Sequence, residues 1–179
     1  MEALTDAGLG LDYGTLRLVR TTEAWISAGA QLRDRVADML GDLAAGVEQI
    51  GSSSVLGLLA KPIVDLAVGL PAHHDLALVS STLEANGWIY RGDAGDNGGH
   101  VFVLEARPWH RVAHLHVVDY GKAQWLNYLR LRDLLRRSPE ARSRYEAVKL
   151  QLADEHGDGR KGYTDGKSTV VLTLLHDIT

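Results

Sequence analysis

Apolar and polar positions first settle into a regular pattern after residue 20, where apolar side chains recur with the spacing of one helix face. These positions are Trp25, Leu32, Val36, Leu40 and Leu43. Thr21 and Thr22 stand just before them. Threonine suits a helix N-terminus because its hydroxyl can accept a hydrogen bond from a free backbone N–H. The pattern predicts a helix that starts at these threonines and ends before Gly46.

Shorter apolar runs predict strands. They cover residues 16–20, 47–50, 63–68, 88–91, 101–105 and 112–118. A helix is expected over residues 72–86, with Gly87 as its left-handed stop. A short helix near residues 54–60 would follow a turn at Gly51, and the glycine-rich residues 92–99 predict a hairpin-type connection.

The pattern becomes helical after Asp119. Ser138 followed by Pro139 is the order that opens a helix, and residues 154–162 break the pattern before a final helix. Strands first and helices last indicate an α+β fold, a mixed β-sheet with flanking helices and a helical C-terminal portion. We expect a single domain over residues 1–179, with residues 1–15 as a loose N-terminal arm.

Composition narrows the class of protein. The chain has 179 residues, of which 45% are apolar and 23% charged, and it contains no cysteine, so disulfides and thiolate metal sites are excluded. No stretch approaches the roughly 20 apolar residues that cross a bilayer, and the first residues lack the pattern of a secretory signal. We therefore expect a soluble, cytoplasmic protein with no membrane partner.

Charge is unevenly distributed along the chain. The net charge of −4 argues against a protein that coats DNA or RNA. Residues 121–149, however, hold eight basic and three acidic side chains, a net charge of +5 that leaves −9 for the rest. This segment is either a solvated helix face or an anion clamp that faces the Gly51 turn.

The segment from Gly51 to Gly69 carries the clearest chemistry. Backbone N–H groups in a glycine-serine turn can hold phosphate oxygens, so Gly51, Ser52 and Ser53 are candidate phosphate-binding residues. Lys61 can supply a positive charge, although it can equally be a surface lysine before a strand. Asp65 can supply a hard oxygen ligand for Mg²⁺. These residues indicate a nucleotide-binding site.

The same segment, EQIGSSSVLGLLAKPIVDLAV, resembles the GrpB family, which has a nucleotidyltransferase-like fold. Further matches are HLHVV at residues 114–118, LRLRDLLRRSPE at 129–140, YEAVKLQLA at 145–153 and YTDGKS at 163–168. Together they span most of the chain from about Trp25 onward. The chain departs from the family pattern at Gln49, where histidine is usual, and at Leu56, where proline is usual. Loss of that histidine would remove a possible general base or ligand.

The resemblance implies that Asp65 is the first carboxylate of a metal site. Nucleotidyltransferases usually place a second acid two residues later, on the same strand face, but this chain has Ala67 there. His114 and His116 would face one way on a strand, which makes them candidates for metal ligand or general base. They could also simply flank Leu115 on a half-exposed strand. We expect Asp65 and His116 as metal ligands, with Mg²⁺ favoured over zinc because no third ligand has zinc-type spacing.

The resemblance also implies that Arg132, Lys149 and Lys167 close over nucleotide phosphates, although each can be an ordinary helix-surface charge. The predicted function is transfer of a nucleotidyl or phosphoryl group from ATP or another nucleoside triphosphate to a small-molecule acceptor. Asp65, His114 and His116 are the predicted catalytic residues. The alternatives are a nucleotide-binding module without turnover, which Ala67 favours, and a re-purposed ATP-using biosynthetic enzyme such as a ligase.

Overall fold

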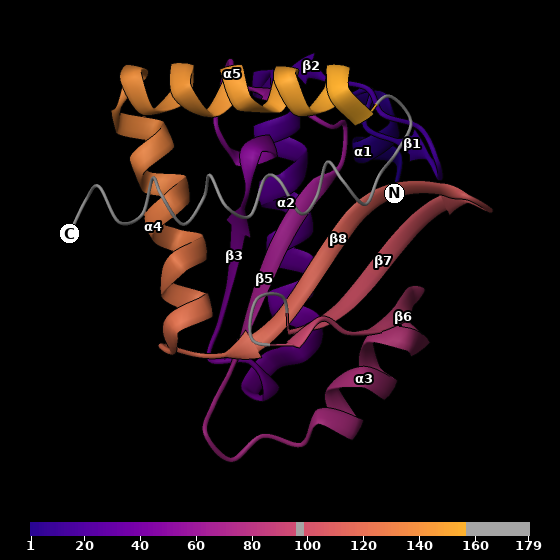
Figure 1. The fold of residues 1–179 in the computed structure, drawn as a ribbon. Helices are drawn as coiled ribbons and strands as arrows, with labels where there is room; N and C mark the ends of the chain where they lie inside the picture. The colour runs from indigo at the N-terminus through magenta and orange to yellow at the C-terminus, as the bar shows by residue number, and fades with distance from the viewer. Residues whose placement is uncertain (96–98, 157–179) are drawn as a thin grey trace.

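A mixed β-sheet forms the centre of the protein, and the computed structural model describes residues 1–95 and 99–156 (Figure 1). Its strands lie in the order β3 (Gly46–Ile50), β5 (Val64–Leu70), β8 (His110–Asp119), β7 (His100–Arg107) and β6 (Trp88–Asp93), and β1 (Leu11–Asp12) also pairs with β8. β5 and β8 are parallel, whereas the other neighbours are antiparallel. The predicted α+β fold with a mixed sheet is confirmed.

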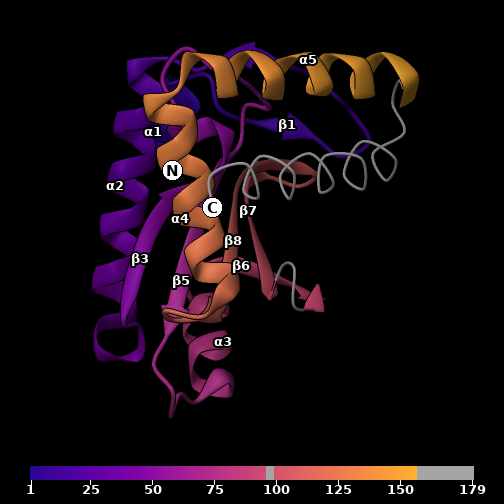
Figure 2. The ribbon, with the colours of Figure 1, turned by 60° about the vertical axis from the view of Figure 1, so that its left-hand side comes forward.

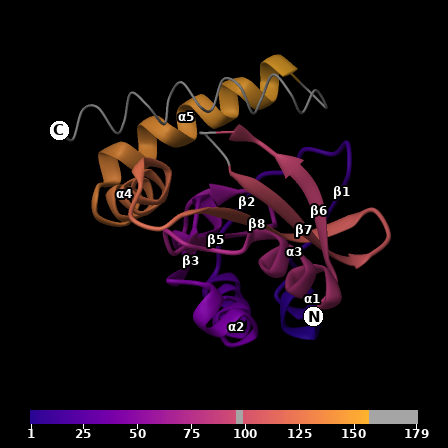
Figure 3. The ribbon, with the colours of Figure 1, turned by 90° about the horizontal axis from the view of Figure 1, so that it is seen from below.

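Helices lie on both sides of this sheet (Figure 3). One side carries α1 (Glu2–Asp6), α2 (Glu23–Leu40) and α3 (Leu76–Ala85), and the other carries α4 (Ala123–Arg137) and α5 (Pro139–His156). Figure 2 shows α2 and α4 on opposite sides of β3 and β5. In the part of the chain that the structure describes, no helix is both long and apolar enough to cross a bilayer.

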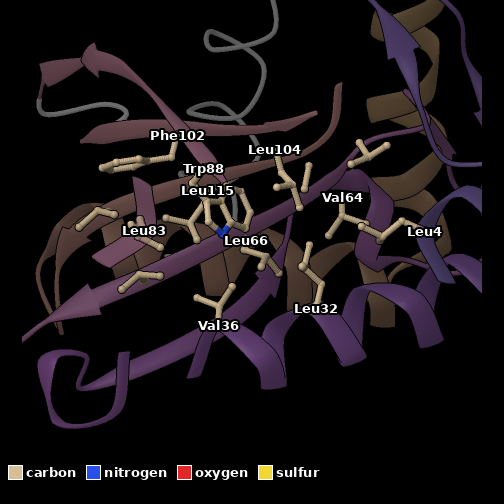
Figure 4. Packing of buried hydrophobic residues seen from close by; sticks show 14 of the residues in the cluster. Leu4, Leu32, Val36, Val64, Leu66, Leu83, Trp88, Phe102, Leu104 and Leu115 are labelled. Atoms are coloured by element: carbon tan, nitrogen blue, oxygen red, sulfur yellow. The ribbon is translucent and has the colours of Figure 1, made fainter. Parts of the chain in front are cut away.

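The helix predicted after residue 20 is confirmed as α2. The Thr22 hydroxyl accepts a hydrogen bond from the Trp25 backbone N–H at 3.3 Å, so Thr22 is the N-cap. Gly41, with φ at +50°, ends the helix, and a short 3₁₀ helix (Gly41–Leu43) follows. The apolar face of α2 packs on β3 and β5, and Leu32 and Val36 lie near Leu66 in the main core (Figure 4).

The helix predicted near residues 54–60 is wrong. A 3₁₀ helix, η2 (Ser52–Ser54), is followed instead by β4 (Leu59–Ala60), which pairs with β2 (Val19–Arg20). The Thr21 N–H donates to the Leu58 carbonyl, and the Gly57 N–H donates to the Thr21 carbonyl. Because these backbone groups bond to a distant segment, a local helix cannot use them.

The N-terminal segment is not a loose arm. Leu4 and Leu9 are buried in the main core, Leu11 is also buried, and the Trp25 indole N–H donates to the Ala7 carbonyl at 2.9 Å. Residues 1–12 therefore close one side of the core and add β1 to the sheet.

The helix start predicted at Ser138 and Pro139 is confirmed. The Ser138 hydroxyl accepts a hydrogen bond from the Ala141 N–H at 3.1 Å at the start of α5. The final helix expected after residue 162, and Lys167 with it, lies outside the described residues.

Candidate functional site

Asp65, His114 and His116 share the sheet face that α4 covers. On β5, Val64 and Leu66 point into the core with α2, so Asp65 and Ala67 point the other way. The parallel register pairs Asp65 with His114 and Ala67 with His116. Asp65 Oδ1 and His114 Nδ1 lie 3.3 Å apart, and both side chains are partly buried. The sheet therefore brings the aspartate and one histidine into direct contact.

The two nitrogens of the His114 ring differ in their surroundings: Nδ1 contacts Asp65, whereas Nε2 does not. An ionised carboxylate can only accept hydrogen bonds, so Nδ1 carries the proton in this pair. In the described part of the chain, Nε2 is buried and has no hydrogen-bond partner. The neutral form of His114 would carry a lone pair at Nε2, the arrangement of a general base oriented by a carboxylate. His116 packs with the Tyr128 ring of α4 at 5.5 Å between centroids.

The Gly51 turn lies directly against Asp65. Ile50, the last residue of β3, pairs with Asp65, and Gly51 follows with φ at +69° and ψ at −170°. A Cβ on Gly51 would lie 2.8 Å from Asp65 Oδ2, closer than side chains tolerate. The Ser53 hydroxyl accepts a hydrogen bond from the Asp65 N–H at 3.2 Å. Glycine is therefore required here by both its backbone conformation and the neighbouring carboxylate.

Ser52 and Lys149 are held inside the protein behind this turn. Lys149 is 2% exposed, and its Nζ donates to the Ser52 hydroxyl at 3.0 Å and to the Leu59 carbonyl. The same Nζ lies 4.9 Å from the centre of the Tyr145 ring. These contacts make Lys149 a support that joins α5 to the turn.

Arg132 lies at the edge of β3. Its Nη1 donates to Glu48 Oε2 at 2.7 Å and to the Gln49 carbonyl at 3.2 Å, and its Nε donates to Asp133 at 2.8 Å. Burial works to lower the pKa of Arg132, but the hydrogen bonds to the two carboxylates together raise it above its ordinary value. Lys61 lies half-buried in the loop between β4 and β5.

Gln49 does not belong to this site. It pairs with Leu66, and a Cβ on Gly29 of α2 would lie 2.1 Å from Gln49 Nε2, so its side chain points into the opposite face of the sheet. The expectation that loss of a histidine here removes a general base from the site is wrong for that reason.

Glu48 is a residue that the sequence analysis missed. It pairs with Ala67, on the same face as Asp65 and two residues before Ile50. The alternation of a strand, counted back from the Gly51 turn, would have identified it. β3 thus places the Glu48 carboxylate opposite Ala67, the position on β5 where a second acid was expected.

The described residues do not gather three acidic or histidine side chains in a group that could hold a metal ion. Asp65 and the nearby Glu48 are carboxylates from different strands, and Glu48 is paired with Arg132. A Mg²⁺ ion that arrives with a nucleotide needs only one or two protein carboxylates, because phosphate oxygens and water complete its shell. Asp65 and Glu48 would supply that number of carboxylates on this sheet face, so the residues present could hold such a nucleotide-borne ion.

The model of the GrpB protein family matches residues 15–177. The chain belongs to the GrpB family. A relative named glutamate-rich protein GrpB, from Alkalihalophilus pseudofirmus, is 26% identical over 173 residues, which cover 95% of this chain and 99% of the relative. The family resemblance found in the sequence motifs is therefore confirmed.

Solved structures agree with the family and the fold. The crystal structure of GrpB from Enterococcus faecalis matches with a TM-score of 0.75 and 26% identity, covering 90% of this chain and 99% of that chain. A chain in the structure of the GLD-2/RNP-8 complex matches with a TM-score of 0.53 and 16% identity, covering 86% of this chain and 51% of that chain. The chain has a nucleotidyltransferase-like fold, and its likeness to this second structure extends to the fold alone.

Proposed function

We propose that this GrpB protein binds a nucleoside triphosphate with Mg²⁺ and transfers a nucleotidyl or phosphoryl group to a small-molecule acceptor. The observation that carries the proposal is the continuous contact from the Gly51 turn through the Asp65 carboxylate to the His114 imidazole. A phosphate site, a metal ligand and a proton acceptor are the parts that such a transfer needs. The groups that we propose for these three parts, the Gly51 turn, Asp65 and His114, are neighbours.

The Gly51 turn would hold the phosphates through its backbone. The hydroxyls of Ser53 and Ser54 are bonded within the protein, to the Asp65 N–H and the Gly51 carbonyl. The Ser53 hydroxyl only accepts in its bond with Asp65, so its own O–H could still donate to a phosphate. The phosphates would therefore be held by the backbone N–H groups of the turn, by Ser53 and by the candidate cations Lys61 and Arg132. Lys167 lies outside the described residues and stays a candidate from the sequence alone. Ser52 and Lys149 would act by fixing the shape of the turn.

Asp65 would hold the Mg²⁺ ion together with the phosphates, with Glu48 or His116 as a further ligand from the same face. The ion would neutralise charge on the phosphoryl group. His114 would accept the proton of the attacking hydroxyl or amine at Nε2, while Asp65 keeps its Nδ1 protonated. The acceptor therefore needs an ionisable O–H or N–H that reaches His114.

Ala67 favours a second candidate, a nucleotide-binding module without turnover, because one carboxylate of the usual pair is absent from β5. A re-purposed ATP-using biosynthetic enzyme would use the same phosphate site. In each case we propose a cytoplasmic protein that works on small molecules. The absence of cysteine and the net charge of −4 support that view.

Calorimetry with ATP, GTP, CTP and UTP, with and without Mg²⁺, tests the proposal. We expect at least one nucleotide to bind in a Mg²⁺-dependent way, Asp65→Asn to remove that dependence, and the control Asp38→Asn on the exposed side of α2 to keep it. Release of pyrophosphate or phosphate with an acceptor supports the transferase, whereas binding without turnover supports the module. Lack of binding to every nucleotide, or unchanged Mg²⁺ dependence in Asp65→Asn, would contradict the proposed site.

A further inference from the structure

A separate hollow lies behind the Gly51 turn, between the start of α2 and the junction of α4 with α5. Figure 1 shows α4 running beside β3 and α5 turning from its end across the sheet. The hollow has a volume of about 260 Å³ and is lined by Ile26, Ser54, Val55, Leu56, Arg136 and Arg142. Asp65, His114 and His116 do not line it. Ser54, at the end of the Gly51 turn, is the residue that the hollow shares with the candidate functional site.

Its lining combines two guanidinium groups with apolar side chains and contains no carboxylate. Ile26 and Val55 supply apolar surface, and Leu56 is 53% exposed although it is a large apolar side chain. Outside the lining, Asp133 Oδ1 lies 4.0 Å from Arg136 Nη1. A net positive hollow with an apolar wall favours an anion that also carries an apolar group.

Hydrogen bonds to backbone carbonyls hold Arg136 and Arg142 in place, and both guanidinium groups retain N–H donors that could bind a ligand. Arg136 donates from Nε and Nη2 to the Ser54 carbonyl, at 3.3 and 3.0 Å. Arg142 donates from Nη1 to the Leu135 and Arg136 carbonyls at the end of α4, at 3.3 and 3.2 Å. In the described part of the chain, Nε and Nη2 of Arg142 have no hydrogen-bond partner. Guanidinium groups held in this way are preorganised for a carboxylate.

We propose that this hollow binds a small organic carboxylate with a branched apolar group. The carboxylate would lie between Arg136 and Arg142, and the apolar group would cover Val55 and Leu56. The volume lies just below the usual range for ligand pockets, roughly 300–1,000 Å³, which favours a ligand of few atoms. This proposal does not depend on nucleotide binding.

An amide NMR titration of the full chain with isovalerate tests it, with isovaleramide as the uncharged molecule of the same shape. We expect isovalerate to cause saturable shifts at the Val55 and Leu56 amides and at the side-chain Nε signals of Arg136 and Arg142. Isovaleramide should cause none at the same concentration. Inorganic phosphate at equal ionic strength tests whether charge alone is enough, and we expect it to bind more weakly.

Two variants locate the site. Leu56→Asp adds a negative charge at the exposed rim, and Arg142→Gln removes one guanidinium; each should weaken isovalerate binding roughly tenfold or more. Arg137→Gln, at the end of α4 and outside the hollow, should leave binding unchanged. If Arg142→Gln does not fold, Leu56→Asp decides alone. Equal binding of isovaleramide or phosphate, or undiminished binding in Leu56→Asp, would overturn the proposal.

Discussion

Replacing Gly51 by alanine should destabilise the protein more than the same change at a glycine with open space around it. With φ at +69° and ψ at −170°, Gly51 has a backbone conformation that is essentially restricted to glycine, which costs another residue about 1–3 kcal/mol. The new Cβ would also lie 2.8 Å from Asp65 Oδ2, so the carboxylate must move. Such overpacking costs a further 1–3 kcal/mol or so, giving a total loss of about 2–6 kcal/mol.

Equilibrium urea unfolding measures this loss, and Gly57→Ala is the matched control. Gly57 also has a positive φ, +77°, but a Cβ there would meet nothing within 4 Å. We expect Gly57→Ala to lose only about 1–2 kcal/mol. In an Asp65→Ala background, Gly51→Ala should cost less than in the wild type, because the clashing oxygen is gone. Equal losses in the two glycine variants, or no relief from Asp65→Ala, would refute the contact between the turn and the carboxylate.

Three further predictions concern stability. Lys149→Met should lower the free energy of unfolding by about 1–3 kcal/mol, because the Ser52 hydroxyl and the Leu59 carbonyl lose their hydrogen-bond donor. In the same urea assay, the control Lys122→Met, at an exposed position, should change it little. Thr22→Ala should cost about 1 kcal/mol through loss of the helix N-cap, as thermal unfolding would show. The hydrogen bond with His110 and the nearby cations lower the pKa of Asp12. The stabilisation by ionised Asp12 is thus present above the unfolded pKa and lost as pH falls through the folded pKa. In Asp12→Asn, the urea concentration at the unfolding midpoint should therefore fall less steeply as pH is lowered than in the wild type. An unchanged pH dependence of the midpoint would contradict this.

Local patterns predicted the elements whose signals lie within a few residues of one another. The helix α2 followed from Thr22 and the spacing of its apolar residues, and the start of α5 followed from Ser138 and Pro139. The segment after η2 was mistaken for a helix because its pairing partner at residues 19–20 lies far away in the chain. Leu4 and Leu9 are buried, but they do not form a periodic apolar pattern, so the sequence around them does not predict a buried N-terminus.

The candidate site was predictable in its parts and unpredictable in its contacts. Asp65 and the Gly51 turn are near one another in sequence, so their proximity could be expected. Contact between Asp65 and His114 depends on the parallel register of β5 and β8, which no local pattern fixes. Glu48 differs in part: strand alternation puts it on the sheet face of Asp65, and only its position opposite Ala67 needs the antiparallel register of β3. Strand register, rather than residue type, decides which polar side chains meet.

A crystal structure with a non-hydrolysable nucleoside triphosphate and Mg²⁺ tests the central claim most directly. We predict that its phosphates lie at the backbone N–H groups of the Gly51 turn, with the metal ion on Asp65 and His114 Nε2 facing the transferred phosphoryl group. A nucleotide bound elsewhere on the protein, or a metal ion held without Asp65, would contradict the claim.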